Sequence, residues 1–198
     1  MISELIDVLI SGITNGAVYS IMAAGMALVY GVTKVFNFAY GSFYSLGGYL
    51  AWWLVSMGLP YFVVIIGSIL CLFAFGWGTE KVLLSHLRQK PNWEMMAVMI
   101  TLGLAMFMDN LYQIVFGPFV KELPLLIEGQ THVGSVVLSH QDITMFIIAI
   151  AVMTAFILFL SSTRLGMTVR AVAQNSTGAL IVGVKKDRVF SVTFAVST

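Results

Sequence analysis

The stretch ITMFIIAIAVMTAFILFL, Ile143–Leu160, decides the fold class, because it carries no charged residue and is long enough to cross a bilayer as a helix. The segment that follows it, Ser161–Arg188, is rich in Arg and Lys. Basic loops resist translocation and stay in the cytoplasm. The pair therefore predicts a membrane helix that ends in a cytoplasmic segment.

The composition of the whole chain agrees with this prediction. Of the 198 residues, 59% are hydrophobic and 10% are charged, and the mean hydropathy is +0.96. A soluble domain has about 25% charged residues, so lipid must replace water around much of this chain. The net charge of +1, without a basic stripe interleaved with aromatic residues, argues against a nucleic-acid partner.

Four further apolar runs of spanning length precede this one: Leu5–Tyr30, Phe36–Met57, Tyr61–Gly78 and Met95–Phe116. A sixth run begins near Val189 and reaches only Thr198, which is too short to span. We therefore expect an all-α, polytopic membrane helix bundle that is truncated at its C-terminus.

The basic residues predict how these helices are threaded. Nine of the ten lie in three segments, and the tenth, Lys121, stands apart: Lys34; Lys81, Arg88 and Lys90; Arg164, Arg170, Lys185, Lys186 and Arg188. These segments are predicted to face the cytoplasm, and the Gly58–Pro60 turn and Gly117–Asp142 to face outside. The N-terminus is then outside. Within the exterior segment, the β-branched stretch Val133–Leu138 favours a short strand or hairpin arm.

Polar residues inside the predicted helices are candidates for function, because such groups are costly in lipid. Asp109 is the one acidic residue predicted in mid-run, with Gln113 one turn on. The alternative for Asp109 is a hydrogen-bond clamp between helices, or a position near the outer interface. Asn15 is expected to face the bundle interior or a water-filled cavity. The polar, glycine-rich start of the second run, with Asn37 and Tyr40, indicates a broken or re-entrant segment.

The basic segment Ser161–Arg188 is predicted to form two short helices rather than a plain connector. Apolar and basic residues alternate at helical spacing in its first half. Asn175 and Ser176 are suited to cap a second helix that runs through Ile181, with Gly183 as its stop. Two roles remain open for this pair: an interfacial helix against anionic lipid, or docking into a groove on a cytosolic protein.

The chain lacks the motifs of common enzymes. It has no phosphate-binding G-x-x-x-x-G-K-[ST] loop, no G-x-S-x-G elbow and no H-E-x-x-H pair. Its three histidines, His86, His132 and His140, fall in predicted loops at unrelated spacings. We therefore expect no catalytic residues, no metal site and no cofactor.

Three blocks of sequence, in this order, resemble the membrane permeases of branched-chain amino acid (LIV-type) ABC transporters. NGAVYSIMAAGMALVYGVTKVFNFAYGSFYSLGGYLA, Asn15–Ala51, resembles the opening signature of that family. ITLGLAMFMDNLYQIVFG, Ile100–Gly117, is similar to its Thr-Leu-Gly helix. TRLGMTVRAVAQNSTGALIVGV, Thr163–Val184, resembles the cytoplasmic loop that contacts the ATPase. Tyr40 departs from the pattern, because the family usually has His there, and a phenol is no proton acceptor near neutral pH.

The resemblance implies that residues 1–198 are an incomplete permease domain with a coupling loop at 161–188. It implies a subunit of an ABC importer for branched-chain amino acids in the inner membrane, driven by ATP hydrolysis elsewhere. The expected partners are a second related permease, cytosolic ABC ATPases, an external substrate-binding protein and the amino-acid substrate. The residues expected to couple to the ATPase are Arg164, Gly166, Arg170, Ala171, Asn175 and Gly183. Those expected along the translocation pathway are Asn15, Asn37, Tyr40, Asp109 and Gln113.

Three other functions remain open at this point. A permease of the same family could carry urea, short amides or another amino acid. A stand-alone secondary transporter or channel would need ion-binding residues in several helices, and only Asp109 qualifies. An intramembrane enzyme would need a nucleophile with its base, or a metal cluster, within the helices.

Overall fold

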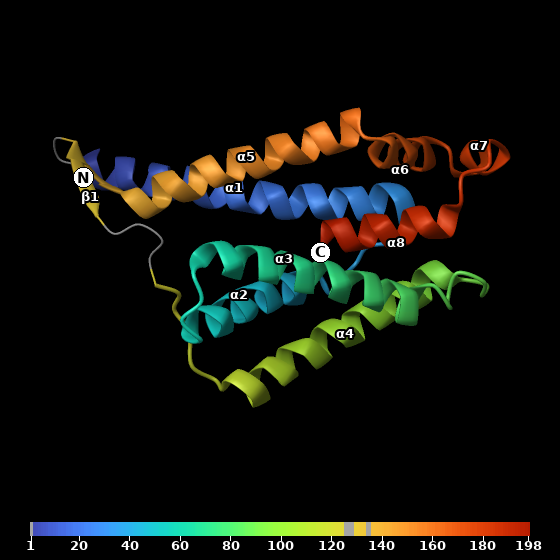
Figure 1. Cartoon of the computed structure of the whole chain (residues 1–198), viewed down its shortest axis with the longest axis horizontal. Coiled ribbons are helices and arrows are strands. Elements are labelled where there is room, and N and C mark those ends of the chain that lie inside the picture. Colours follow the sequence, from blue (N-terminus) through green and yellow to red (C-terminus); the bar gives the residue numbers. More distant parts are fainter. Residues whose placement is uncertain (1, 125–128, 134–135) are drawn as a thin grey trace. The chain divides into compact units, whose positions relative to one another are not determined.

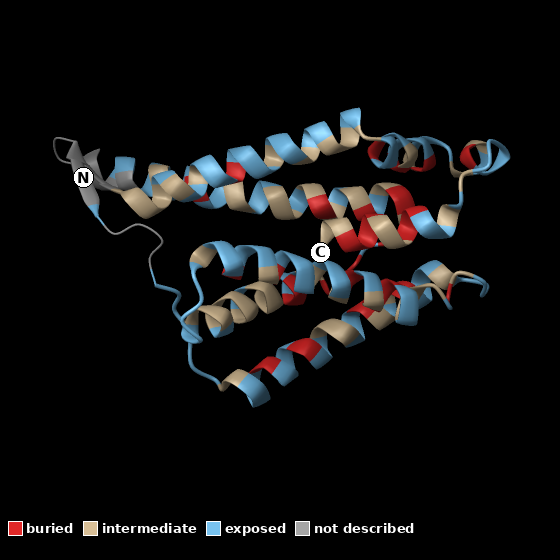
Figure 2. Ribbon diagram, viewed as in Figure 1, coloured by how far each residue is buried: buried red, intermediate tan, exposed pale blue. Residues whose placement is uncertain are grey.

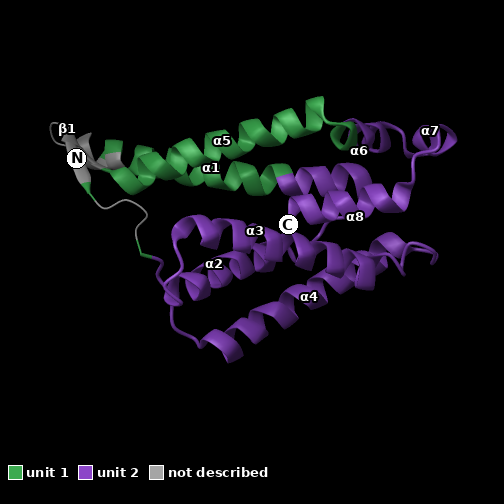
Figure 3. Cartoon of the chain, viewed as in Figure 1, with its two compact units in different colours: residues 1–24, 124–166 green, residues 25–123, 167–198 purple. Residues whose placement is uncertain are grey.

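The computed structural model describes residues 2–124, 129–133 and 136–198, and its contacts divide the chain into two compact units (Figure 3). Unit 1 comprises Met1–Ala24 and Pro124–Gly166, and unit 2 comprises Gly25–Leu123 and Met167–Thr198. Helix α1, Ile2–Thr33, begins in unit 1 and ends in unit 2. The prediction of one permease domain is not decided by this division.

Unit 1 pairs the first part of α1 with α5, His140–Ser162, and a small hairpin (Figure 1). Strands β1, Gln130–Val133, and β2, Val136–Ser139, pair antiparallel with Val133 opposite Val136. The hairpin predicted around Val133–Leu138 is therefore present. It is the one β element in the described part of the chain, so the predicted helical class holds.

Unit 2 contains the remaining helices, which Figure 1 labels except for η1. They are α2, Tyr40–Ser56; α3, Tyr61–Thr79; the π-helical turn η1, Glu80–Leu84; α4, Trp93–Phe116; α6, Arg164–Gln174, which begins in unit 1; α7, Ser176–Ile181; and α8, Lys186–Ser197. The turn η1 continues α3 without a break, so the helix runs past the predicted end of its apolar run at Gly78.

Four described helical stretches are long and apolar enough to cross a membrane: Val8–Thr33, Tyr61–Leu84, Trp93–Phe116 and His140–Ser162. The chain is thus a multi-pass membrane protein. The predicted run Phe36–Met57 differs, because its helix α2 starts only at Tyr40 and has 17 residues. At 1.5 Å per residue, α2 spans roughly 25 Å of an apolar layer about 30 Å thick.

Much of each long helix is exposed (Figure 2), and many of the exposed side chains are large and apolar. On α5, Ile147, Ile150 and Ile157 are all half-exposed or more, while Ala149 is buried. Apolar faces of this extent are stable only against lipid or other helices. The exposure pattern therefore agrees with membrane embedding.

The basic segments of unit 2 share one end of that unit (Figure 1). Lys34 follows the end of α1, Lys81 lies in η1, and the Lys185–Arg188 cluster opens α8. Lys121 follows the opposite end of α4. The grouping of basic segments on one side, which the sequence predicts, is found in this unit.

The core of unit 2 centres on Phe43 of α2, which is 1% exposed. Its ring meets Phe75 of α3 and Phe194 of α8 edge-on, with centroids 5.6 and 6.1 Å apart. Val29 of α1 and Ala39 complete the buried cluster. Edge-to-face aromatic pairs add to the area they bury, so this cluster fixes α2, α3 and α8 against the end of α1.

Two glycines allow helices to approach closely beside this core. A Cβ on Gly25 of α1 would collide with the Tyr40 hydroxyl and lie 3.0 Å from the Ser197 carbonyl oxygen. A Cβ on Gly76 of α3 would lie 2.8 Å from Cβ of Thr198. Small residues at such crossings are typical of membrane helix packing. Tyr40 fills the space at Gly25 and donates a hydrogen bond to the Ser197 carbonyl.

We expect Gly25→Ala to lower the melting temperature of the detergent-solubilised protein, because overpacking a tight contact costs roughly 1–3 kcal/mol. Gly25→Ala combined with Tyr40→Phe should recover part of the loss, since the colliding hydroxyl is gone. Gly12→Ala, where nothing lies within 4 Å of the added Cβ, is the control on the same helix. A Gly25→Ala protein as stable as the control would contradict this packing.

Candidate functional site

The junction between α5 and α6 is fixed by Thr163 and Gly166. The Thr163 hydroxyl donates to the Phe159 carbonyl over 2.7 Å and accepts the Gly166 amide over 2.9 Å. A Cβ on Gly166 would collide with the Phe159 carbonyl and lie 2.6 Å from Cα of Leu160. Because these are backbone atoms, they cannot move to make room for a side chain. The sharp turn into α6 therefore needs glycine at position 166.

Helix α6 is amphipathic, as predicted. Val169 and Val172 are 3% and 2% exposed, whereas Arg164, Arg170 and Ala171 are exposed. Val169 and Val172 sit three residues apart, which places them on one face of the helix. The predicted coupling residues of α6 other than the buried Gly166 therefore lie on its accessible side.

Helix α7 begins and ends at the predicted residues. The Asn175 side chain caps it by accepting the Gly178 amide over 2.8 Å. At the other end, Gly183 has a φ of +85°, and the amides of Gly183 and Val184 bond the carbonyls of Leu180 and Ala179, both over 3.0 Å. This is a Schellman cap, which favours glycine.

The capped end of α7 exposes three consecutive apolar side chains. Leu180, Ile181 and Val182 are 51%, 81% and 78% exposed, while Ala179 behind them is buried at 5%. We call these three residues the α7 tip. An exposed apolar patch of this kind is a candidate interaction surface.

A buried ion network links η1 to the start of α8. Glu80 is 1% exposed. It pairs with Arg88 and accepts a hydrogen bond from the Ser191 hydroxyl. Arg88 also bonds the Asp187 carboxylate over 2.7 Å. A buried carboxylate is tolerated when its charge is paired and hydrogen-bonded.

Aromatic rings support this network from α8 and α4. The Arg88 guanidinium lies 4.6 Å from the centroid of the Phe190 ring, and the Lys186 amine 5.2 Å from it. Trp93 of α4 packs 6.4 Å from the same ring. Burial lowers the pKa of Arg88, and the bond to Asp187 opposes that shift. An arginine side chain nevertheless remains protonated in proteins.

The start of α2 is a polar turn inside unit 2. Asn37, 3% exposed, accepts the Ala39 amide through Oδ1 over 3.0 Å. The Phe38 amide bonds Oγ1 of Thr101 on α4 over 3.3 Å. A cavity of about 20 Å³ is lined by Asn37 and Thr101 together with Glu80 and Arg88. The predicted break before α2 is thus present, and the amides of Phe38 and Ala39 find partners within the protein.

Asp109 of α4 also meets α2. Its Oδ1 accepts the Ser42 hydroxyl over 2.8 Å, and the Tyr112 hydroxyl donates to the Ser42 carbonyl over 2.7 Å. The clamp between helices, which the sequence left open as an alternative, is therefore formed by Asp109. Gln113 is exposed one turn further along α4.

The structure thus brings together only some of the residues predicted along a pathway. Asn37, Tyr40 and Asp109 gather at the start of α2 in unit 2. Asn15 is exposed on the part of α1 that belongs to unit 1. Their transport role stays a prediction.

The sequence pattern does not predict the ion network, because the apolar run ends at Gly78 and Glu80 falls in the basic segment that follows it. The signal was the continuation Val82-Leu83-Leu84, which carries the helix one turn past Glu80. The structure shows Glu80 buried at the end of a spanning stretch, with its partners 8 to 111 residues away along the chain.

Comparison with known proteins matches residues 8–198 to the model of a family described as "Branched-chain amino acid transport system / permease component". No solved structure matches the chain significantly.

The curated relatives include the high-affinity branched-chain amino acid transport system permease proteins LivH of Salmonella typhimurium and of Escherichia coli. They are 29% and 28% identical over 200 residues, which is 94% of this chain and 64% of each relative. BraD of Pseudomonas aeruginosa is 28% identical over 202 residues, or 95% of this chain and 65% of BraD. The chain thus spans just under two thirds of the length of these relatives. It belongs to the family of branched-chain amino acid transport system permease components.

Proposed function

We propose that this chain acts in a permease subunit of an ABC importer that moves branched-chain amino acids across the inner membrane. The membership of the family and the names of its relatives support this role. The chain would work with a second related permease, cytosolic ABC ATPases that hydrolyse ATP, and an external substrate-binding protein. The basic end of unit 2 would face the cytoplasm and the N-terminus the outside.

The observation that carries this proposal is the α7 tip. Leu180, Ile181 and Val182 stand exposed at the basic end of unit 2, between the Asn175 cap and the Gly183 cap. A short, rigid helix with an apolar end is suited to enter a groove on a partner protein. Arg170, exposed on the part of α6 that belongs to unit 2, would lie at the rim of that contact.

The ion network would carry movement of α7 into the membrane. The Gly183 cap closes α7, and Asp187 in the first turn of α8, four residues further on, is bonded to Arg88. Arg88 is paired with Glu80 at the end of the spanning stretch Tyr61–Leu84. A displacement of α7 by an ATPase would therefore reach α3 through ion pairs, and α8 through the backbone.

The polar start of α2 would border the path of the substrate. Asn37, Tyr40 and Asp109 offer polar groups at membrane depth without an array of fixed charges. A nearly neutral path suits a zwitterion with an apolar side chain, because strong fixed charge would trap it. A related substrate, such as urea, an amide or another amino acid, would fit this chemistry as well. ATP-independent uptake would instead favour a stand-alone transporter.

The coupling role is tested by Arg170→Glu. We expect the variant to insert into the membrane normally but to retain roughly tenfold less cytosolic ATPase on copurification, which corresponds to about 1.4 kcal/mol of binding free energy. Uptake of labelled leucine should fall with it. Lys90→Glu, an exposed charge reversal at the same end but outside α6 and α7, is the control. Normal uptake by Arg170→Glu would refute this role.

The network is tested by Arg88→Ala, which leaves the Glu80 carboxylate buried without its cation. Removing one partner of a buried ion pair costs roughly 3–5 kcal/mol, so the melting temperature in detergent should drop clearly. Glu80→Gln with Arg88→Ala removes both charges and should recover much of it. If Arg88→Ala and the double variant are equally stable, the pair does not hold η1 to α8.

The pathway role of Asp109 is tested by Asp109→Asn, whose amide oxygen can still accept the Ser42 hydroxyl. If the charge acts in transport, uptake should fall roughly tenfold, the effect of about 1.4 kcal/mol on a barrier, while stability stays unchanged. Asn110→Ala is the control, because the Asn110 side chain bonds the Met106 carbonyl of its own helix over 2.6 Å. Unchanged uptake would leave Asp109 as a structural clamp only.

A further inference from the structure

A basic groove lies in unit 2 between η1, the segment that follows it, and the connection from α7 to α8. Its volume is about 1160 Å³. Four cationic side chains line it in addition to Arg88: Lys81, Lys185, Lys186 and Arg188. Asp187 is the one carboxylate among its lining residues in the described part of the chain, and Arg88 already binds it. The groove therefore has an excess of positive charge that the carboxylates of the ion network do not neutralise.

The position of the groove sets the depth at which a ligand would lie. The spanning stretch Tyr61–Leu84 ends beside it, and the next span starts at Trp93. Trp77 and Trp93 both line the groove. Tryptophan is enriched where a membrane meets water, so the cations of the groove lie at the level of lipid headgroups.

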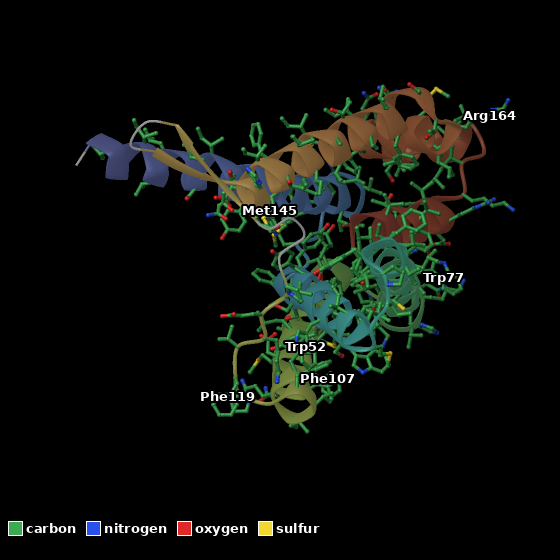
Figure 4. The ribbon with its side chains drawn as sticks, turned by 60° about the vertical axis from the view of Figure 1, so that its left-hand side comes forward. Trp52, Trp77, Phe107, Phe119, Met145 and Arg164 are labelled. Atoms are coloured by element: carbon green, nitrogen blue, oxygen red, sulfur yellow. The ribbon has the colours of Figure 1, made fainter. Side chains whose placement is uncertain are left out.

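An apolar track on α3 leads into the groove. Ile66, Ile69, Phe73 and Trp77 are all exposed and follow one another at spacings of three and four residues. They therefore lie on one face of the helix. Trp77 projects from the outer side of unit 2 (Figure 4), and Lys81 follows it one turn further on. A ligand that fits both parts has an anionic head and an apolar tail.

We propose that this groove is a binding site for an anionic phospholipid, with its phosphate among Lys81, Lys185, Lys186 and Arg188 and an acyl chain along the α3 track. Basic pockets beside membrane helices hold such headgroups by charge. A soluble phosphate ion could bind the same cations, but it has no acyl chain to contact the α3 track. This inference rests on membrane embedding and on none of the proposed transport roles.

The test uses the intact protein, delipidated in detergent and titrated with phosphatidylglycerol or phosphatidylcholine under native mass spectrometry. We expect phosphatidylglycerol to bind at least about tenfold more tightly. The variant Lys81→Gln/Lys185→Gln/Lys186→Gln should lose that preference, whereas Lys90→Gln, in the same segment but outside the groove lining, should keep it. Equal binding of the two lipids, or a preference unchanged in the triple variant, would overturn the proposal.

Two further experiments distinguish a lipid from a soluble phosphate and test the acyl-chain contact without relying on the fold of the triple variant. Inorganic phosphate in the millimolar range should not displace phosphatidylglycerol, and full displacement would make the groove a site for soluble anions. Phosphatidylglycerol with brominated acyl chains should quench tryptophan fluorescence in the wild-type fold, and Trp77→Phe should remove part of that quenching. If the triple variant keeps its lipid but loses a copurifying ATPase, the groove is a protein-docking surface and the lipid proposal fails.

Discussion

The buried carboxylate of Glu80 is the constraint on which the arrangement of unit 2 depends. At 1% exposure and at the end of a spanning helix, this charge has neither water nor solvent ions to stabilise it. It needs a cation and a donor at fixed positions. Arg88 and Ser191 meet that need, and in doing so they bring the segment after η1 and the helix α8 to the same place.

This requirement would make the proposed coupling mechanical. Helix α7, which precedes the network along the chain, is closed at its two ends by the Asn175 and Gly183 caps. Close-packed elements transmit a displacement instead of absorbing it. A partner that moves the α7 tip would therefore act on α3 and α8 together.

The parts of this structure that could be predicted from sequence are those with a local cause. The apolar runs predict the long helices, and Asn175 and Gly183 predict the two ends of α7. The ion network could not be predicted, since Glu80 and Ser191 are 111 residues apart and the nearby Lys and Arg made Glu80 look like a loop residue. The polar residues Asn37 and Tyr40 indicate a break there, but the exact start of α2 could not be predicted, because Phe36 and Phe38 keep the apolar run continuous across the turn.

That turn also explains how a helix can begin at membrane depth. The amides of Phe38 and Ala39 would be unpaired in lipid, and each finds a side-chain oxygen, from Thr101 and Asn37 respectively. Tyr40 then crosses to α8 and donates to the Ser197 carbonyl, a bond that a phenol makes without needing an acceptor nitrogen. Where the resemblance expects a histidine, Tyr40 thus provides a link between α2 and α8 and, unlike an imidazole, no group that ordinarily titrates near neutral pH. If Tyr40 has the proposed role in transport, the role would rest on holding α2 to α8 at this depth.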